Sequence, residues 1–372
     1  MSDRGTSSPA DTEQLCELGF YTLAGHSATP HDLVDEVVTG EQLGLGTAFI
    51  SERFNSKDAT TLSGAAGAVS TTLGVATAAT NHNTRHPIVT ANFAMTMHRL
   101  TEGRFALGLG RGFDALFDIM GLPRITMAAL TDAIDLQRRL WHGEIIFDHD
   151  GPAGKFPMLC LETSFDEDIP VMLTALGERT LEFAGGLVDG VVLHTFFSDE
   201  ALAASVAAVR RGAEKAGRDP QSVRIWSVLA TVGDHLSDDL RLKKLTGRLA
   251  TYLQGYGDLM VSVNGWDPEV LTRFRASEHV TSIGGAIDAV ATTEQLQRIG
   301  ELLPDEWLAS AATGSPEQCA ARVLSQFDLG ADGVILHGAT PTELAPVVQA
   351  YRTLRPADRF SNQLANPGMA AR

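Results

Sequence analysis

The pattern D-G-V-x-L-H occurs twice in the sequence, at 189–194 and at 332–337, and each copy ends in a histidine, His194 or His337. Histidine titrates near neutral pH and is therefore suited to moving a proton during catalysis. Each copy contains a short apolar run typical of a buried parallel strand, and barrel enzymes carry their catalytic groups at the C-terminal ends of such strands. The alternative is that both are ordinary turn histidines that bond to the backbone.

Two glycine-containing segments would expose backbone N–H groups at strand ends. In GLGRG (108–112) the glycines would let the backbone approach a ring or a phosphate. In ALGER (175–179) a glycine precedes a helix, whose first N–H groups can bind an anion, with Arg179 nearby. The alternative for the first segment is a turn that only packs strand against helix. The alternative for the second is a tight turn with Arg179 in solvent.

Glu52 and Arg53 end another apolar run, in the segment ISERF (50–54). Because successive strand residues face opposite sides, only one of the two can point into a pocket unless the strand has already ended. A surface ion pair is the alternative.

Metal and serine-nucleophile chemistry are not predicted. Histidines 82, 86 and 98 come without an acidic residue at ligand spacing, and no H-E-x-x-H occurs. The nucleophile-elbow pattern G-x-S-x-G is also missing.

The elements that must carry these residues alternate along the chain. Short apolar runs are each followed by a stretch with apolar residues at helical spacing, which is typical of β-α units. Eight candidate strands occur, at 18–25, 47–51, 73–80, 104–110, 170–176, 190–196, 223–232 and 333–338. Eight such units favour an α/β fold of the closed (β/α)8 TIM-barrel type over an open doubly wound sheet. The first strand also lacks the G-x-G-x-x-G fingerprint of a dinucleotide-binding fold.

We therefore predict a single barrel domain over residues 17–358. A flexible tail (1–16) precedes it, and a C-terminal tail (359–372) follows. Two regions exceed a minimal barrel, near 144–169 and 234–314, and long insertions in a barrel usually form lids or binding loops.

The 372 residues include 46 Asp and Glu against 29 Lys and Arg, a formal charge of -17. Such a surface repels phosphate backbones and anionic membranes, so nucleic acid and membranes are not expected partners. No segment has the pattern of a signal peptide or a membrane span. The three cysteines are too scattered for a zinc site or a disulfide framework. These features predict a cytoplasmic protein with a small-molecule substrate.

Four segments together resemble the luciferase-like monooxygenase superfamily. They are TNHNTRHP (80–87), LTEGRFALGLGRG (100–112), IPVMLTALGERTLEFAGGLVDGVVLHTF (169–196) and GSPEQCAARVLSQFDLGADGVILHG (314–338). Within the superfamily, the chain is most similar to actinobacterial oxidoreductases that use the deazaflavin coenzyme F420, over about residues 18–356.

The resemblance implies a flavin-like ring at the C-terminal ends of the strands, against a bulge in strand three. A non-proline cis peptide is frequent there in the superfamily, and here it would fall near Thr77 to Ala79. The resemblance also implies a homodimer. The positions that match cofactor-contacting residues of the superfamily are Glu52, Thr80, Asn81, Arg111, Gly112, Gly177 and Glu178.

Departures from the sugar-phosphate dehydrogenases of the superfamily concern the substrate. Arg53 stands where those enzymes have a His, Phe113 where they have a Glu, and Phe197 where they have a Lys. We therefore expect a substrate that is more apolar than a sugar phosphate. The residues expected near it are Phe113, Phe196, Phe197 and Trp226.

The sequence thus predicts an oxidoreductase that transfers hydride between coenzyme F420 and a small apolar alcohol, carbonyl or enone. We expect His194 to move the proton, with Arg53 and Glu52 as electrostatic partners. The positive patch for the anionic part of F420 would come from Arg85, Arg111 and Arg179. The alternatives are an FMN-dependent monooxygenase of the same superfamily, a non-catalytic flavin-binding barrel and an unrelated barrel enzyme.

Overall fold

The structure is a computed structural model that describes residues 13–54, 56–356 and 358–371. Most of the predicted N-terminal tail lies outside the described residues. Residues 15 and 16 of that tail belong to the first strand, because Leu15 is fully buried and pairs with Leu45.

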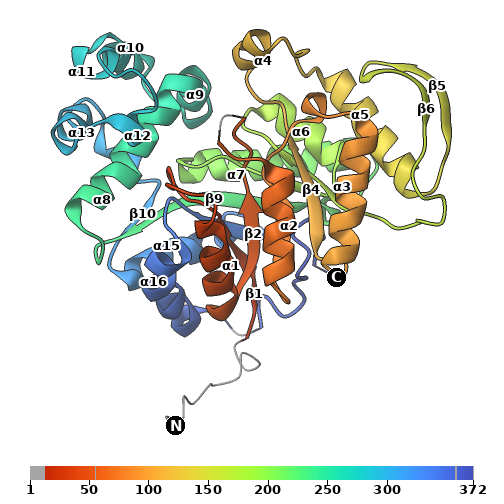
Figure 1. Cartoon of the computed structure of the whole chain (residues 1–372). Coiled ribbons are helices and arrows are strands. Elements are labelled where there is room, and N and C mark those ends of the chain that lie inside the picture. The colour runs from red at the N-terminus through yellow and green to blue at the C-terminus, as the bar shows by residue number, and fades with distance from the viewer. Residues whose placement is uncertain (1–12, 55, 357, 372) are drawn as a thin grey trace.

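Eight parallel strands form a closed barrel, which confirms the predicted fold (Figure 1). They are β1 (Leu15–Tyr21), β2 (Leu45–Ile50), β3 (Gly74–Thr77), β4 (Phe105–Gly110), β7 (Val171–Thr174), β8 (Gly190–Val192), β9 (Arg224–Gly233) and β11 (Gly333–His337). The ring closes because β9 pairs with both β8 and β11, and β11 pairs with β1.

Helices surround the barrel and pack on its outer face. They are α1 (Asp32–Gln42), α2 (Ala59–Val69), α3 (Pro87–Leu100), α5 (Met127–Trp141), α6 (Glu178–Leu187), α7 (Asp199–Lys215), α15 (Pro316–Asp328) and α16 (Pro341–Leu354). Strand residues alternate between two apolar layers: Leu107 and Leu109 of β4 face the helices, whereas Ala106 faces the barrel interior.

The two predicted insertions have structures of their own. The first is an antiparallel hairpin of β5 (Ile146–Gly151) and β6 (Gly154–Leu159). The second follows β9 and forms a lobe with its own apolar core (Figure 1). Its elements are α8 (Asp238–Leu242), α9 (Arg248–Asn264), α10 (Pro268–Ala276), α11 (Glu278–Thr281), α12 (Ile287–Val290), α13 (Thr293–Gly300), α14 (Asp305–Leu308) and β10 (Ala312–Gly314). A further short helix, α4 (Asp114–Met120), follows β4.

The C-terminal segment is part of the barrel rather than a separate tail. Buried Arg224 is the first residue of β9 and donates hydrogen bonds to the carbonyl oxygens of Leu364, Asn366 and Met369. The indole of Trp226 donates to the carbonyl oxygen of Pro367 at 2.8 Å. Residues 364–369 therefore close the N-terminal end of the barrel. Residues at this end of a barrel usually contribute to stability, whereas catalytic residues lie at the C-terminal end.

Within the described part of the chain, no helix combines the length and apolar character needed to cross a membrane.

Candidate functional site

At the C-terminal ends of the strands, the inward-facing residues are small on one side of the barrel and polar on the other. Alternation from the interior residues Ala76, Ala106, Val192 and Ile335 places the next inward positions two residues on. On β3 and β4 these positions carry only small groups, namely Ala78, Gly108 and Gly110. On β1, β8 and β11 they carry Tyr21, His194 and His337. The site therefore has a flat floor on one side and polar groups on the other.

The floor is built by a bulge after β3. The peptide bond Ala78–Ala79 is cis, as the resemblance implies. Beyond it the chain rejoins β4, because Thr80 N donates to Gly108 O at 3.0 Å and Gly110 N donates to Thr80 O at 2.9 Å. A side chain at Gly108 would bring its Cβ to 1.7 Å from Thr77 O, so only glycine allows β4 to approach the bulge so closely.

Thr80 and Asn81 lie on this bulge, as expected. The Asn81 amide donates to Gly110 O at 2.7 Å and ties the bulge to the end of β4. Thr80 donates its hydroxyl to Glu52, and Arg85 donates to Thr80 Oγ1 at 2.8 Å. The loop that begins at Thr80 is therefore held in place by side-chain hydrogen bonds to Glu52 and Arg85, and it forms the rim of the site.

Glu52 and Arg53 do not pair with each other. Glu52 forms a bidentate ion pair with Arg85, which also binds Asp58 at 2.8 Å. The strand β2 has ended at Ile50, so both side chains can turn toward the strand ends. Arg85 is consequently occupied by two carboxylates, and our expectation that it meets an anionic cofactor tail is not supported by its contacts.

The remaining predicted cofactor residues lie on two exposed loops. Arg111 is exposed and bonds only weakly to Ile125 O at 3.3 Å, and Gly112 has a φ of 61° that favours glycine. On the second loop, Gly177 is the N-cap residue of α6 and offers no side chain to the first helical N–H groups. Glu178 points to Arg211, at 2.7 Å, while Arg179 is exposed. Free N–H groups beside an arginine suit an anion.

His194 lies between aromatic rings at the end of β8. Its Nδ1 is 3.0 Å from Thr195 O, so Nδ1 carries the hydrogen and Nε2 is left as an acceptor. Tyr252 and Tyr256 meet it edge-on, at 4.7 and 5.4 Å between ring centroids. Burial lowers the pKa of His194 to about 4, so the imidazole is neutral at pH 7. His194 thus makes the backbone bond of an ordinary turn histidine and still keeps one nitrogen that can accept a proton.

Tyr252, Tyr256 and Arg248 are site residues that the sequence reasoning missed. They come from α9 of the second insertion, and Tyr252 places its hydroxyl 3.2 Å from His337 Nε2. Burial and nearby cations lower the pKa of His337, whose buried Nδ1 has no hydrogen-bond partner among the described residues. A signal was available: an Arg and two Tyr at intervals of four residues lie on one face of a helix.

The four aromatic residues predicted near the substrate separate in the structure. Phe113 stacks on Tyr256 with 4.3 Å between centroids, at the rim of the site. Phe196 packs in the apolar core of the second insertion, with 6.3 Å between its ring centroid and that of Tyr252. Phe197 instead packs in the layer between barrel and helices, and Trp226 is fully buried at the opposite end of the barrel. Phe197 and Trp226 therefore do not line the pocket at the C-terminal ends of the strands, contrary to our expectation.

The floor, the loops and one unpartnered hydroxyl fit a flat ring with an anionic tail. Thr174 ends β7 facing the interior, since Met172 two residues earlier is in the interior core. Its buried Oγ1 has no partner in the described structure, and it can bond to a polar ring edge. Among the described residues no cluster of three or more His, Cys, Asp or Glu side chains could hold a metal.

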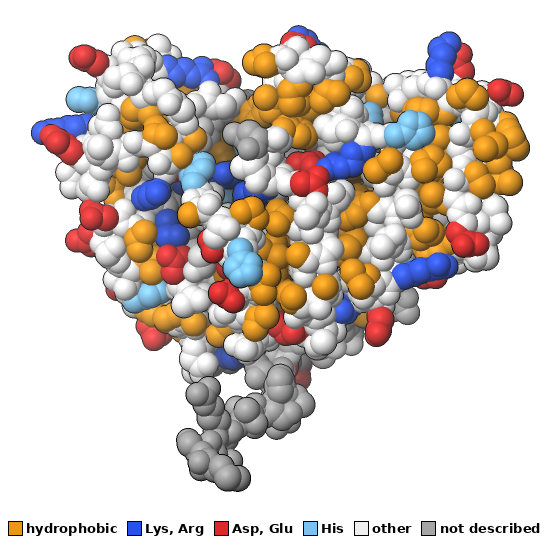
Figure 2. All heavy atoms as spheres, in the orientation of Figure 1, with side chains coloured by type: hydrophobic (Ala, Val, Ile, Leu, Met, Phe, Trp, Pro, Cys, Tyr) orange, Lys and Arg blue, Asp and Glu red, His pale blue; other side chains and the backbone are white. Residues whose placement is uncertain are grey.

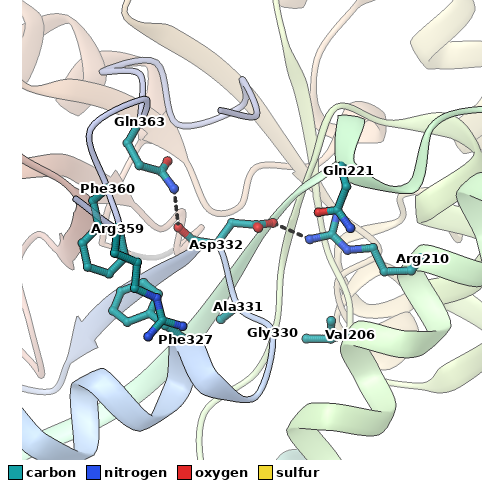
Figure 3. Close-up of a pocket in the computed structure, with 10 residues that line it drawn as sticks. All are labelled: Val206, Arg210, Gln221, Phe327, Gly330, Ala331, Asp332, Arg359, Phe360 and Gln363. Carbon is teal, nitrogen blue, oxygen red and sulfur yellow. Dashed lines mark hydrogen bonds and ion pairs between the residues drawn. The ribbon is translucent and has the colours of Figure 1, made fainter. Parts of the chain in front are cut away.

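A separate cavity of about 430 Å³ lies at the other end of the barrel. Figure 3 shows Asp332 reaching toward Arg210 and Gln363 bonding to the Asp332 backbone, with Arg359 beside Phe360. Its lining comes from α7, from the segments before β9 and β11, from the end of α15 and from the C-terminal segment. Asp332 pairs with Arg210, and its backbone oxygen accepts from Gln363, whose buried Oε1 has no partner among the described residues. The cavity lies away from the C-terminal strand ends that carry the candidate site.

An eight-stranded barrel with glycine-rich loops and polar side chains at the C-terminal ends of its strands has the architecture of a barrel enzyme. The model of the luciferase-like monooxygenase family matches residues 15–333, and the chain belongs to this family.

Two curated relatives cover most of the chain. A 5,10-methylenetetrahydromethanopterin reductase from Methanolobus tindarius is 27% identical over 299 residues, covering 79% of this chain and 86% of the relative. An F420-dependent glucose-6-phosphate dehydrogenase from Intrasporangium calvum is 26% identical over 339 residues, covering 83% and 89%.

Solved structures share the fold. The coenzyme F420 dependent tetrahydromethanopterin reductase from Methanopyrus kandleri has a TM-score of 0.75 at 18% identity, covering 93% of this chain and all of that one. The oxygenating constituent of 3,6-diketocamphane monooxygenase from Pseudomonas putida, in complex with FMN, has a TM-score of 0.62 at 17% identity, covering 95% and 99%. Proteins named for F420 and for FMN therefore share this architecture.

Proposed function

We propose that the protein is an oxidoreductase that transfers hydride between coenzyme F420 and a small apolar alcohol, carbonyl or enone. The observation that carries this proposal is that small inward positions on β3 and β4, Ala78, Gly108 and Gly110, and the inward position of His194 on β8 lie at the same end of the barrel. The name of one curated relative, the F420-dependent glucose-6-phosphate dehydrogenase, supports F420 as the cofactor. A bound deazaflavin would supply the hydride chemistry, which leaves the protein to bind, orient and manage one proton.

The chain's own residues can hold such a cofactor at three places. The floor on β3 and β4 supports the ring, because no side chain larger than alanine rises from it. The hydroxyl of Thr174 is free for a polar ring edge. The N-terminus of α6 with Arg179, together with Arg111, suits the anionic tail.

His194 would hold or accept the substrate proton. Its Nε2 is the available acceptor, because Nδ1–H is donated to Thr195 O. In the direction of alcohol oxidation, a neutral imidazole accepts the hydroxyl proton as hydride leaves the carbon. The nearby Tyr252 hydroxyl and His337 form a second polar pair on the same side of the site.

The mouth of the site suits an apolar substrate. Phe113 stacks on Tyr256, and Leu116, Ile119 and Leu259 are exposed around them, Ile119 to 83%. Figure 2 shows apolar side chains gathered over α4 at the top of the molecule, beside a hollow between α4 and the second insertion. Exposed apolar groups that rim a site favour an apolar ligand. Turnover of glucose 6-phosphate with F420 would contradict this substrate class.

Parallel fluorescence titrations of the purified protein with F420 and with FMN test the cofactor. We expect saturable binding of F420 that is tighter than that of FMN, followed by reduction or oxidation of bound F420 on addition of an alcohol or enone panel. Tighter binding of FMN would favour the monooxygenase alternative. Binding of F420 without turnover of any panel member would favour a non-catalytic barrel. The homodimer stays a prediction, which light scattering after size-exclusion chromatography tests.

A further inference from the structure

Two cationic side chains beside the mouth of the site lack a carboxylate partner. Arg53 and Lys57 are neighbours in a tight turn, because Arg53 N donates to Lys57 O at 3.0 Å and Lys57 N donates to Arg53 O at 2.8 Å. Arg53 Nη1 donates to Gly25 O and lies 3.2 Å from His26 Nδ1, and Lys57 Nζ donates to Leu23 O. Within residues 13–54, 56–356 and 358–371, neither side chain forms an ion pair.

The buried carboxylate of Asp288 already has three partners. Asp288 forms an ion pair with Arg248 Nη2 at 2.7 Å and accepts hydrogen bonds from Thr251 Oγ1 at 2.8 Å and His26 Nε2 at 3.0 Å. Its ion pair with Arg248 offsets the charge of that cation, and among the described residues Asp288 forms no ion pair with Arg53. The other buried acid near Lys57 is Glu36, whose pKa is raised to about 7 by burial, so it carries only part of a negative charge at pH 7.

The positive charges of Arg53, Lys57 and Arg248 consequently lie near one another in a partly buried region. Burial and the neighbouring Arg248 lower the pKa of Arg53, and burial and Arg53 lower the pKa of Lys57 to about 8. This local excess of positive charge is unexpected in a chain with a formal charge of -17. An anion between the cations would relieve their repulsion.

The cations border the proposed substrate pocket rather than the cofactor loops. The Arg248 guanidinium lies 5.7 Å from the centre of the Tyr252 ring, and that ring meets His194 at 4.7 Å. The buried, unpartnered Nδ1 of His337 belongs to the same group of side chains. By contrast, the loop proposed for the cofactor's anionic tail begins at Gly177, on another strand.

We propose that Arg53, assisted by Lys57 and Arg248, binds a carboxylate on the substrate, which is therefore an apolar acid carrying the alcohol, carbonyl or enone. This inference rests on the proposed function. The Nε and Nη2 edge of Arg53 has no partner among the described residues, and this edge matches the two oxygens of a carboxylate. The aromatic and apolar rim would hold the rest of the molecule.

Calorimetric titration of the full chain with a matched pair of probes, cinnamate and cinnamamide, tests the proposal with and without F420. We expect the acid to bind roughly ten- to a hundredfold more tightly than the amide, as a charge-assisted bond to arginine requires. Arg53→Gln should abolish that preference, and Arg53→Lys should keep part of it. Arg275→Gln is the matched control, because it removes the same guanidinium group from the second insertion, where Arg275 pairs with exposed Asp258.

Equal binding of acid and amide, no binding of the acid, or a preference that survives in Arg53→Gln would overturn the proposal. Phenyl phosphate binding more tightly than cinnamate would overturn the choice of a carboxylate. Displacement of cinnamate by F420 would show that the cations serve the cofactor instead. Failure of F420 to bind, with an intact Arg53-dependent preference for the acid, would overturn the proposed function and leave the anion site standing.

Discussion

Gly108 is the position at which a single methyl group should damage the floor of the site most. In Gly108→Ala, the new Cβ would lie 1.7 Å from the backbone oxygen of Thr77, and real Cβ contacts are not found under 3.0 Å. The obstruction is backbone rather than a movable side chain, so β4 and the bulge after β3 must separate. Overpacking of this kind costs about 1–3 kcal/mol, and the rigid neighbour places this variant at or above the upper end of that range.

The separation should also reach the cofactor contacts. Gly108 O accepts from Thr80 N at 3.0 Å and from Thr77 Oγ1 at 2.7 Å, so moving Gly108 moves the residue expected to touch the ring. We expect F420 affinity to fall by more than about tenfold, which corresponds to 1.4 kcal/mol. Fluorescence titration gives the affinity, and urea denaturation of the same sample gives the free energy of unfolding.

Two glycine variants serve as controls. Gly74→Ala also creates a clash, at 2.2 Å from Ala365 O, but at the opposite end of β3, so it should lower stability and leave F420 affinity unchanged. Gly64→Ala lies in α2 with open space around the new methyl group and should raise stability by about 0.5–1 kcal/mol. A folded Gly108→Ala protein with wild-type F420 affinity would refute the reasoning, as would an equal loss of affinity in Gly74→Ala.

Three further predictions concern His194 and the closed end of the barrel. His194→Ala should lower kcat by roughly 10²–10⁴-fold while sparing F420 affinity, and unchanged turnover would remove His194 from the mechanism. Because burial lowers the pKa of His194 from 6.5 to about 4, its neutral form contributes stability above pH 6.5 that is lost as the pH falls toward 4, and kcat/KM for alcohol oxidation should decline near pH 4. A limb near pH 6.5 that disappears in His194→Ala would contradict this placement. Arg224→Met should lower the free energy of unfolding by about 3–5 kcal/mol, because it leaves carbonyl groups of Cys16 and of the C-terminal segment unpaired, and calorimetry should show this with F420 affinity intact.

The barrel could be predicted from the sequence because its signals are local. Each strand is a short apolar run, and the eight predicted runs coincide with the eight barrel strands within a few residues. The cis peptide at Ala78–Ala79 was expected from resemblance alone, since no local pattern requires it. The roles of Thr80 and Asn81 at the bulge have the same origin.

Pairings between distant segments could not be predicted. Glu52 and Arg53 are adjacent, yet their partners Arg85 and His26 come from different loops, and which partner each takes depends on where β2 ends. Phe197 and Trp226 are expected near the substrate because departures from the sugar-phosphate dehydrogenases indicate an apolar ligand. That comparison gives neither the layer nor the end of the barrel in which a side chain lies. The contribution of Tyr252 required knowing how an insertion folds back over the strand ends.

A crystal structure of the protein with bound F420 would test the central claim most directly. We expect the deazaflavin ring on the floor formed by Ala78, Gly108 and Gly110, with its anionic tail at the N-terminus of α6 and its reactive face toward His194. A ring bound elsewhere, or bound with its reactive face turned away from His194, would contradict the account.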